Sequence, residues 1–183
     1  MNNLPPSNQK FSDWLQFNTL GDPQLEKAVV AAKRWVTAMK NGEEPRWLSL
    51  LGTSGVGKTH IANRLFEWAR PRFDEHRCIY TPTIVYWPDF VQRLRSGTSF
   101  QKRDDMKVWP VLCLDDIGSE RDTTGFASEE LNTLLGCRAR KWTILTSNLG
   151  IASIANVDAR LSSRLIRDKN ICIEINTRDF ATR

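Results

Sequence analysis

A glycine-rich stretch carries the strongest chemical signal in this sequence: GTSGVGKTH, which runs from Gly52 to His60 directly after the apolar run 47–51. Small residues let consecutive backbone N–H groups curl around phosphate oxygens, and a following helix adds the positive end of its dipole. Lys58 can reach β- and γ-phosphate oxygens, and Thr59 can be a ligand of Mg²⁺. The match to G-x-x-x-x-G-K-[ST] predicts a nucleoside triphosphate site, and the alternative is a glycine turn that opens an ordinary helix. The residues expected to bind the nucleotide are Gly52, Thr53, Ser54, Gly55, Val56, Gly57, Lys58, Thr59 and His60.

Two adjacent carboxylates follow another apolar run. Residues 111–114 are typical of a buried strand, and Asp115 and Asp116 come at its carboxyl end, the edge where open α/β sheets bind ligands. This is the pattern of a Walker B motif. Asp115 would hold Mg²⁺ through its water shell, and Asp116 could orient or deprotonate an attacking water. The alternative is a strand that ends in an acidic turn.

A polar side chain also follows the apolar run 143–147. Asn148 would lie beside the Walker B strand, near the γ-phosphate, where its amide could position a water molecule. An asparagine after a strand is otherwise an ordinary turn residue.

Further along, Asp158 is suited to cap a helix on which Leu161 and Leu165 share one face. Arg164 need not be buried with these leucines, so its guanidinium is available for a phosphate.

The elements that would position these residues alternate along the chain. Asp22 and Pro23 predict the start of an amphipathic helix. After it, helix-like segments separate five short apolar runs, which predicts an α/β three-layer fold with a parallel sheet. The runs are 47–51, 78–81, 111–114, 143–147 and 171–175. We expect residues 1–21 to form a strap, residues 22–183 a single domain, and the polar, basic segment 96–108 an exposed, mobile loop.

Composition narrows the class of protein. The chain has 183 residues and a formal net charge of +5, which permits binding to a polyanion without requiring it. No apolar stretch approaches the roughly 20 residues that a membrane span needs, so we expect no membrane association. The amino-terminal residues lack the apolar core of a secretory signal, which favours a cytoplasmic protein.

The motifs GTSGVGKTH, LDDIG, TSNL and RLSSRL together resemble the DnaC/IstB-type branch of the AAA+ ATPases. That branch contains bacterial and phage helicase loaders and the ATPase subunits of some transposition systems. The resemblance runs from about Phe11 to the end of the chain, and His60 and Arg138 fit it. It implies a five-stranded P-loop sheet ordered 5-1-4-3-2, an ATP site at a subunit boundary, Asn148 as sensor 1, and Arg164 as an arginine finger acting in trans. Most loaders carry a separate amino-terminal helicase-binding domain, which we do not expect in this sequence. We also expect no full helical lid, and its absence is common in this branch.

The branch inserts an extra helix at the position of residues 85–95, where Pro88 suits a helical first turn. Exposed aromatic rings beside arginines are suited to single-stranded DNA, because bases stack on rings and guanidinium groups neutralise phosphates. The DNA-contacting candidates are Trp87, Arg93, Arg95, Lys102 and Arg103. Phe90 and Leu94 recur at helical spacing, which favours packing in the core over contact with DNA.

These observations favour an ATPase that requires Mg²⁺, is weak unless assembled, and acts in DNA replication. Its expected partners are the replicative DNA helicase, single-stranded DNA, and further copies of itself joined through the ATP site. A transposition ATPase that recruits a transposase shares every motif. A nucleotide-dependent scaffold with little hydrolysis and a monomeric small-molecule kinase are the alternatives from other classes.

Overall fold

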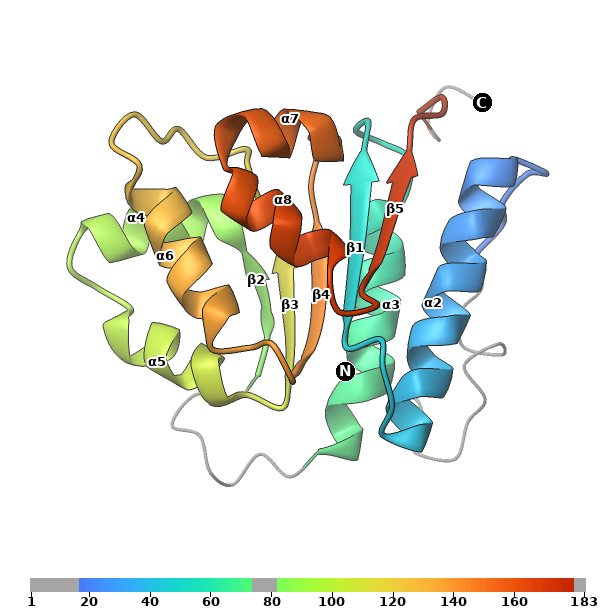
Figure 1. Ribbon diagram of the computed structural model, residues 1–183, viewed down its shortest axis with the longest axis horizontal. Coiled ribbons are helices and arrows are strands. Elements are labelled where there is room, and N and C mark those ends of the chain that lie inside the picture. Colours follow the sequence, from blue (N-terminus) through green and yellow to red (C-terminus); the bar gives the residue numbers. More distant parts are fainter. Residues whose placement is uncertain (1–16, 74–81, 180–183) are drawn as a thin grey trace, which may run out of the picture.

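The structure, a computed structural model, describes residues 17–73 and 82–179 (Figure 1). Helices and strands alternate along these residues. Their bounds are α2 Pro23–Asn41, β1 Trp47–Gly52, α3 Lys58–Ala69, a 3₁₀ turn Arg70–Arg72, β2 Ile84–Tyr86, α4 Trp87–Arg95, α5 Phe100–Val108, β3 Val111–Asp115, α6 Phe126–Gly136, β4 Trp142–Thr146, α7 Ile151–Val157, α8 Ala159–Ile166 and β5 Ile171–Ile175.

The five strands form one parallel sheet in the order β2-β3-β4-β1-β5, which confirms the predicted order 5-1-4-3-2. Helices cover both faces (Figure 1). Leu48 and Leu50 of β1 pack toward α2 and α3, while Trp47 and Leu51 of the same strand pack toward α4, α6 and α8. Strand β1, which lies between β4 and β5, is therefore buried on both sides, as an apolar run in a parallel sheet should be.

Helix α2 begins where the sequence predicts. The Asp22 carboxylate accepts hydrogen bonds from two backbone N–H groups of the first turn, and Pro23 is the first helical residue. The helix ends at Gly42, whose φ of +72° suits a glycine C-cap.

The predicted strand 78–81 lies outside the described residues, and the strand β2 of the described sheet is Ile84–Tyr86. The segment 96–108, expected to be a loop, contains the helix α5. That expectation was wrong because α5 is polar on most of its surface but buries Met106 completely. Residues 1–16 of the predicted strap, 1–21, lie outside the described residues.

Candidate nucleotide-binding and catalytic site

The glycine-rich loop joins β1 to α3 at the carboxyl edge of the sheet (Figure 1). Gly52 has a φ of +114°, and a Cβ there would lie 2.3 Å from the Ile175 carbonyl oxygen, so no other residue fits. Gly57, with a φ of +92°, caps α3, which begins at Lys58. Val56 is fully buried and anchors the loop in the core. The loop therefore lies at the positive end of α3.

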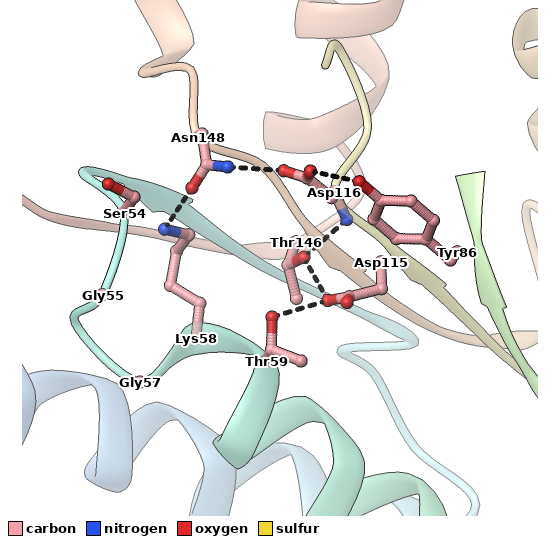
Figure 2. A pocket seen from close by; sticks show the side chains of 10 residues that line it. All are labelled: Ser54, Gly55, Gly57, Lys58, Thr59, Tyr86, Asp115, Asp116, Thr146 and Asn148. Atoms are coloured by element: carbon pink, nitrogen blue, oxygen red, sulfur yellow. Dashed lines mark hydrogen bonds between the residues drawn. The ribbon is translucent and has the colours of Figure 1, made fainter. Parts of the chain in front are cut away.

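Lys58 points along this loop toward the end of β4 (Figure 2). Its Nζ donates to the Gly52 carbonyl at 3.0 Å, to the Thr53 carbonyl at 2.5 Å and to Asn148 Oδ1 at 2.9 Å. Burial lowers the pKa of Lys58, while the charges of Asp116 and Asp115 act in the opposite direction. The ammonium is thus desolvated and faces two carboxylates, which prepares it for phosphate oxygens.

The two aspartates at the end of β3 have different partners (Figure 2). Asp115 Oδ1 accepts a hydrogen bond from Thr59 Oγ1 at 2.9 Å. Asp116 Oδ1 accepts one from Asn148 Nδ2 at 2.6 Å, and Asp116 Oδ2 accepts one from the Tyr86 hydroxyl at 3.3 Å. Asp115 is therefore tied to the glycine-rich loop and Asp116 to the ends of β2 and β4.

A cavity of about 410 Å³ lies between these groups, within the range of small-molecule sites. Its lining includes eight of the predicted residues: Ser54, Gly55, Gly57, Lys58, Thr59, Asp115, Asp116 and Asn148. Thr59 Oγ1 and the Asp115 carboxylate present adjacent oxygen atoms, the donor type that Mg²⁺ prefers. The residues present therefore fit a nucleoside triphosphate with its magnesium ion.

The other predicted nucleotide-binding residues lie around the cavity and do not line it. Thr53 faces away, with its hydroxyl bonded to the Thr177 carbonyl at 3.1 Å. His60 packs its ring against Phe17, with centroids 5.6 Å apart, and burial lowers its pKa. Gly52 and Val56 support the backbone of the loop, as described above.

Tyr86 and Thr146 line the cavity but were not predicted as site residues. Thr146 belongs to the same TSN run as Asn148, and the pairing of β3 with β4 brings its side chain to Asp115. Tyr86 ends β2, a strand that the sequence did not locate at this position. The polar residues that end the neighbouring strands β2, β3 and β4 are the sequence signal that could have located both side chains.

Comparison with known proteins gives the family. A profile of the bacterial DnaA ATPase domain matches residues 16–171. The chain belongs to this family. The DnaA-type ATPase domain described here is 38% identical over 96 residues to the replicative helicase loader DnaI of Bacillus subtilis (strain 168), an alignment that covers 48% of this chain and 28% of DnaI. The chain spans only 28% to 30% of the length of the curated relatives that it matches.

Solved structures agree with this assignment. A DnaI crystal structure superposes with a TM-score of 0.70 at 29% identity, covering 94% of this chain and 90% of that one. A replication initiator DnaA bound to AMPPCP and single-stranded DNA gives a TM-score of 0.68 at 23% identity, covering 97% and 52%, which is a likeness of fold. The DnaA-type ATPase domain therefore has the AAA+ P-loop fold.

Arg164, the predicted arginine finger, does not line the cavity of its own chain. Its guanidinium lies over Gly136, the last residue of α6, where a Cβ would be 3.0 Å from Nη1. Its Nε is buried with no hydrogen-bond partner among the described residues. The side chain is therefore folded against α6 and does not project freely, contrary to the sequence-based expectation. In this arrangement it cannot reach the nucleotide site of the same ATPase domain.

Among the candidates for DNA contact, the expectation for Trp87 was wrong. Its side chain is only 1% exposed, because it starts α4 and packs against Phe90 in the core. Its indole N–H donates to Glu120 Oε1 at 3.1 Å, in the loop after β3. Phe90 and Leu94 are also buried, which confirms their prediction as core residues. The exposed ring at this end of α4 belongs instead to Tyr86.

The four basic candidates divide into two pairs. Arg95 forms an ion pair with Asp122 at 3.2 Å, and Arg103 forms one with Glu130 at 3.3 Å. Arg93 and Lys102 have no ion pair recorded among the described residues, and both line a hollow of about 210 Å³ between α4 and α5. Burial and the charge of Arg93 lower the pKa of Lys102. This second pair is therefore the basic surface that an anion could reach.

No helix in the described ranges 17–73 and 82–179 is both long and apolar enough to span a membrane.

Proposed function

We propose that this chain binds ATP with Mg²⁺ and hydrolyses it slowly until it assembles with further copies. The observation that carries the proposal is the convergence of five predicted residues on one cavity: Lys58, Thr59, Asp115, Asp116 and Asn148. They come from three separate stretches of sequence and are joined by hydrogen bonds of 2.6 to 2.9 Å.

Each residue has a distinct role in hydrolysis. The loop amides and Lys58 hold the phosphates, and Thr59 with Asp115 would hold the magnesium ion. Bound Mg²⁺ neutralises charge that develops on the phosphate oxygens. Asp116 accepts a proton from the attacking water, and Asn148 orients that water. Arg164 of a neighbouring copy, once its side chain has left its place against α6, would approach the γ-phosphate and stabilise its charge.

Thermal unfolding and phosphate release test this function. ATP with Mg²⁺ should raise the midpoint temperature, because a ligand that binds only the folded state stabilises it by mass action. Lys58→Ala should remove most of that shift. Asp116→Asn should keep the shift and lose turnover, since an amide cannot accept the proton. An equal shift in Lys58→Ala would contradict the site.

For the biological role, we propose a cytoplasmic helicase loader in DNA replication that assembles on single-stranded DNA and on the replicative helicase. Support comes from the similarity to DnaI, a replicative helicase loader, and from the fold shared with a DnaA bound to single-stranded DNA. The hollow lined by Arg93 and Lys102 offers positive charge for phosphates.

Affinity purification from the source cell, with the Asp116→Asn variant as bait and ATP present, tests the partner. Recovery of the ring helicase supports a loader, and recovery of a transposase replaces it with a transposition ATPase. ATP binding without measurable turnover, alone or with DNA and partner, would favour a nucleotide-dependent scaffold.

A further inference from the structure

Thr146, the last residue of β4, touches both aspartates of the site with one hydroxyl group. Its Oγ1 donates to Asp115 Oδ1 at 2.7 Å and accepts the backbone N–H of Asp116 at 2.9 Å. Thr146 is only 1% exposed, so water could not readily take over these hydrogen bonds, and their loss would cost folding free energy. Figure 2 shows the hydroxyl between the two residues.

The pairing of β3 with β4 explains this position. Leu114 lies opposite Leu145, so the next residues along, Asp115 and Thr146, are neighbours at the carboxyl edge. A side chain that donates one hydrogen bond and accepts another is needed there, and a hydroxyl group does both. Valine has nearly the same shape but can do neither.

The main chain after Asp115 needs this support. Asp116 has a φ of +63°, in the left-handed region that is uncommon for residues other than glycine, although aspartate adopts it more readily than most. Thr146 holds the N–H of Asp116, and its own carbonyl accepts the N–H of Ile117 at 2.9 Å. Ser147 Oγ donates to the carbonyl of Ile117 at 2.6 Å. Hydrogen bonds from the end of β4 therefore fix the turn at residues 116 and 117, and this turn places the Asp116 carboxylate at the cavity.

Thr146 also completes the surroundings of Asp115. The same oxygen, Oδ1, accepts from Thr59 and from Thr146, so the carboxylate is fixed from the glycine-rich loop on one side and from β4 on the other. Its second oxygen carries no recorded hydrogen bond to a described residue and remains for a cation or its water shell.

We propose that Thr146 is the positioning residue of this ATPase site: one hydroxyl orients Asp115 toward the cation and holds Asp116 in the backbone conformation that water activation requires. The inference rests on the proposed hydrolysis of ATP. It assigns Thr146 no contact with the substrate. Its effect passes through the two carboxylates.

Thr146→Val should lower both kcat and the affinity for Mg²⁺ in the presence of ATP by about 10- to 100-fold, the usual cost of losing an outer partner of a metal ligand. ATP affinity without Mg²⁺ should change little, because Lys58 and the loop amides are untouched. Thr146→Ser restores the hydroxyl and should recover most of the activity.

Thr143→Val is a matched control on the same strand. Thr143 is fully buried, and its hydroxyl bonds to Arg138 Nε and to the Lys141 carbonyl, both at 3.1 Å, at the other end of β4. Assayed at a temperature where both variants are folded, Thr143→Val should keep the wild-type dependence on Mg²⁺. A loss in both valine variants alike would assign the effect to strand stability and overturn the positioning role.

Amide hydrogen exchange by NMR, on the nucleotide-free protein, tests the geometry without ATP. The Asp116 N–H should exchange at least about tenfold faster in Thr146→Val than in the wild type, in Thr146→Ser or in Thr143→Val. Unchanged exchange, or wild-type kcat and Mg²⁺ dependence in Thr146→Val, would overturn the inference. Absence of turnover in the wild type would instead overturn the proposed function, and the exchange result would still decide the role of Thr146 in holding Asp116.

Discussion

Lys58 and Asn148 are hydrogen-bonded across the site, with Nζ donating to Oδ1 at 2.9 Å. The amide nitrogen of Asn148 donates in turn to Asp116 Oδ1 at 2.6 Å. One side chain therefore joins the cation of the glycine-rich loop to the carboxylate proposed to activate water. If Lys58 moves its hydrogen bond from Asn148 to a γ-phosphate, Asn148 Oδ1 loses its donor. The side chain of Asn148 would therefore respond directly to the nucleotide.

Asn148→Ala should retain ATP binding and lose turnover by about 10²-fold or more, the usual cost of removing one polar group that acts on the transition state. Asn148→Asp adds a carboxylate beside the phosphates and should also weaken ATP binding. Isothermal titration and steady-state kinetics separate the two effects. Full turnover in Asn148→Ala would show that Asp116 alone positions the water.

Arg164→Ala should bind ATP normally and hydrolyse it poorly, since an arginine finger contributes about 10³- to 10⁵-fold in rate. Wild-type activity per chain should rise with protein concentration. In a mixture of Lys58→Ala with Arg164→Ala, adjacent copies can pair an intact loop with an intact arginine, so part of the activity should return. No recovery, with mixed assembly confirmed by crosslinking, would contradict action in trans.

Binding to single-stranded DNA should depend on Arg93 and Lys102 more than on Arg95 and Arg103. Replacing the first pair with alanine removes two charges that are free for phosphates, so the slope of log K against log salt should flatten by about 1.4. The second pair already faces Asp122 and Glu130, so its loss should change the slope less. Fluorescence anisotropy across a salt series measures both, and equal slopes for the two double variants would contradict the division.

Arg138 should be essential for stability and not for chemistry. Its side chain is fully buried, and it donates to the Thr143 hydroxyl and to three backbone carbonyls, those of Met106, Trp109 and Trp142. Arg138→Met leaves these acceptors unsatisfied and should lower the free energy of unfolding by about 3 kcal/mol or more in urea titrations. ATP affinity should be unchanged at temperatures where the variant is folded. A loss below about 1 kcal/mol would show that the carbonyls find other donors.

Asp158 should make stability depend on pH. Burial alone would raise its pKa, but hydrogen bonds from the Leu161 amide and from Asn132 lower it overall, below the ordinary value of 3.8. The charged carboxylate therefore stabilises the fold above pH 3.8, and this contribution is lost as pH falls through the lower folded pKa.

Asp158→Asn keeps a helix cap without the titration, so its deficit in unfolding free energy should shrink as pH is lowered from about 7 to about 3. Urea unfolding of both proteins across that range measures the difference. A deficit that stays constant would contradict a stabilising role for the charge.

Much of the site could be predicted because it depends on local sequence. The glycine-rich loop needs glycines at fixed spacing, and the aspartates follow an apolar run, so motif and context located them together. The roles of Tyr86 and Thr146 depend on which strands are neighbours and on their register, and neither is visible in one stretch of residues. Trp87 was predicted to be exposed because arginines follow it in the same segment, whereas the first turn of α4 directs its ring into the core. The composition of α5 is that of a loop, and its completely buried Met106 and the ion pair of Arg103 with Glu130 attach it to the rest of the domain.

The outer side of the glycine-rich loop has a practical consequence for anyone who labels this protein. Thr53 is bonded to the Thr177 carbonyl, the Thr177 hydroxyl reaches Asp22, and the Asn176 N–H donates to Gln24 at 2.6 Å. Residues more than 100 positions apart in the chain thus meet behind the loop. A fluorescent protein inserted directly after residue 177 would strain the same contacts that support the loop, so nucleotide affinities should be measured on protein without such an insertion.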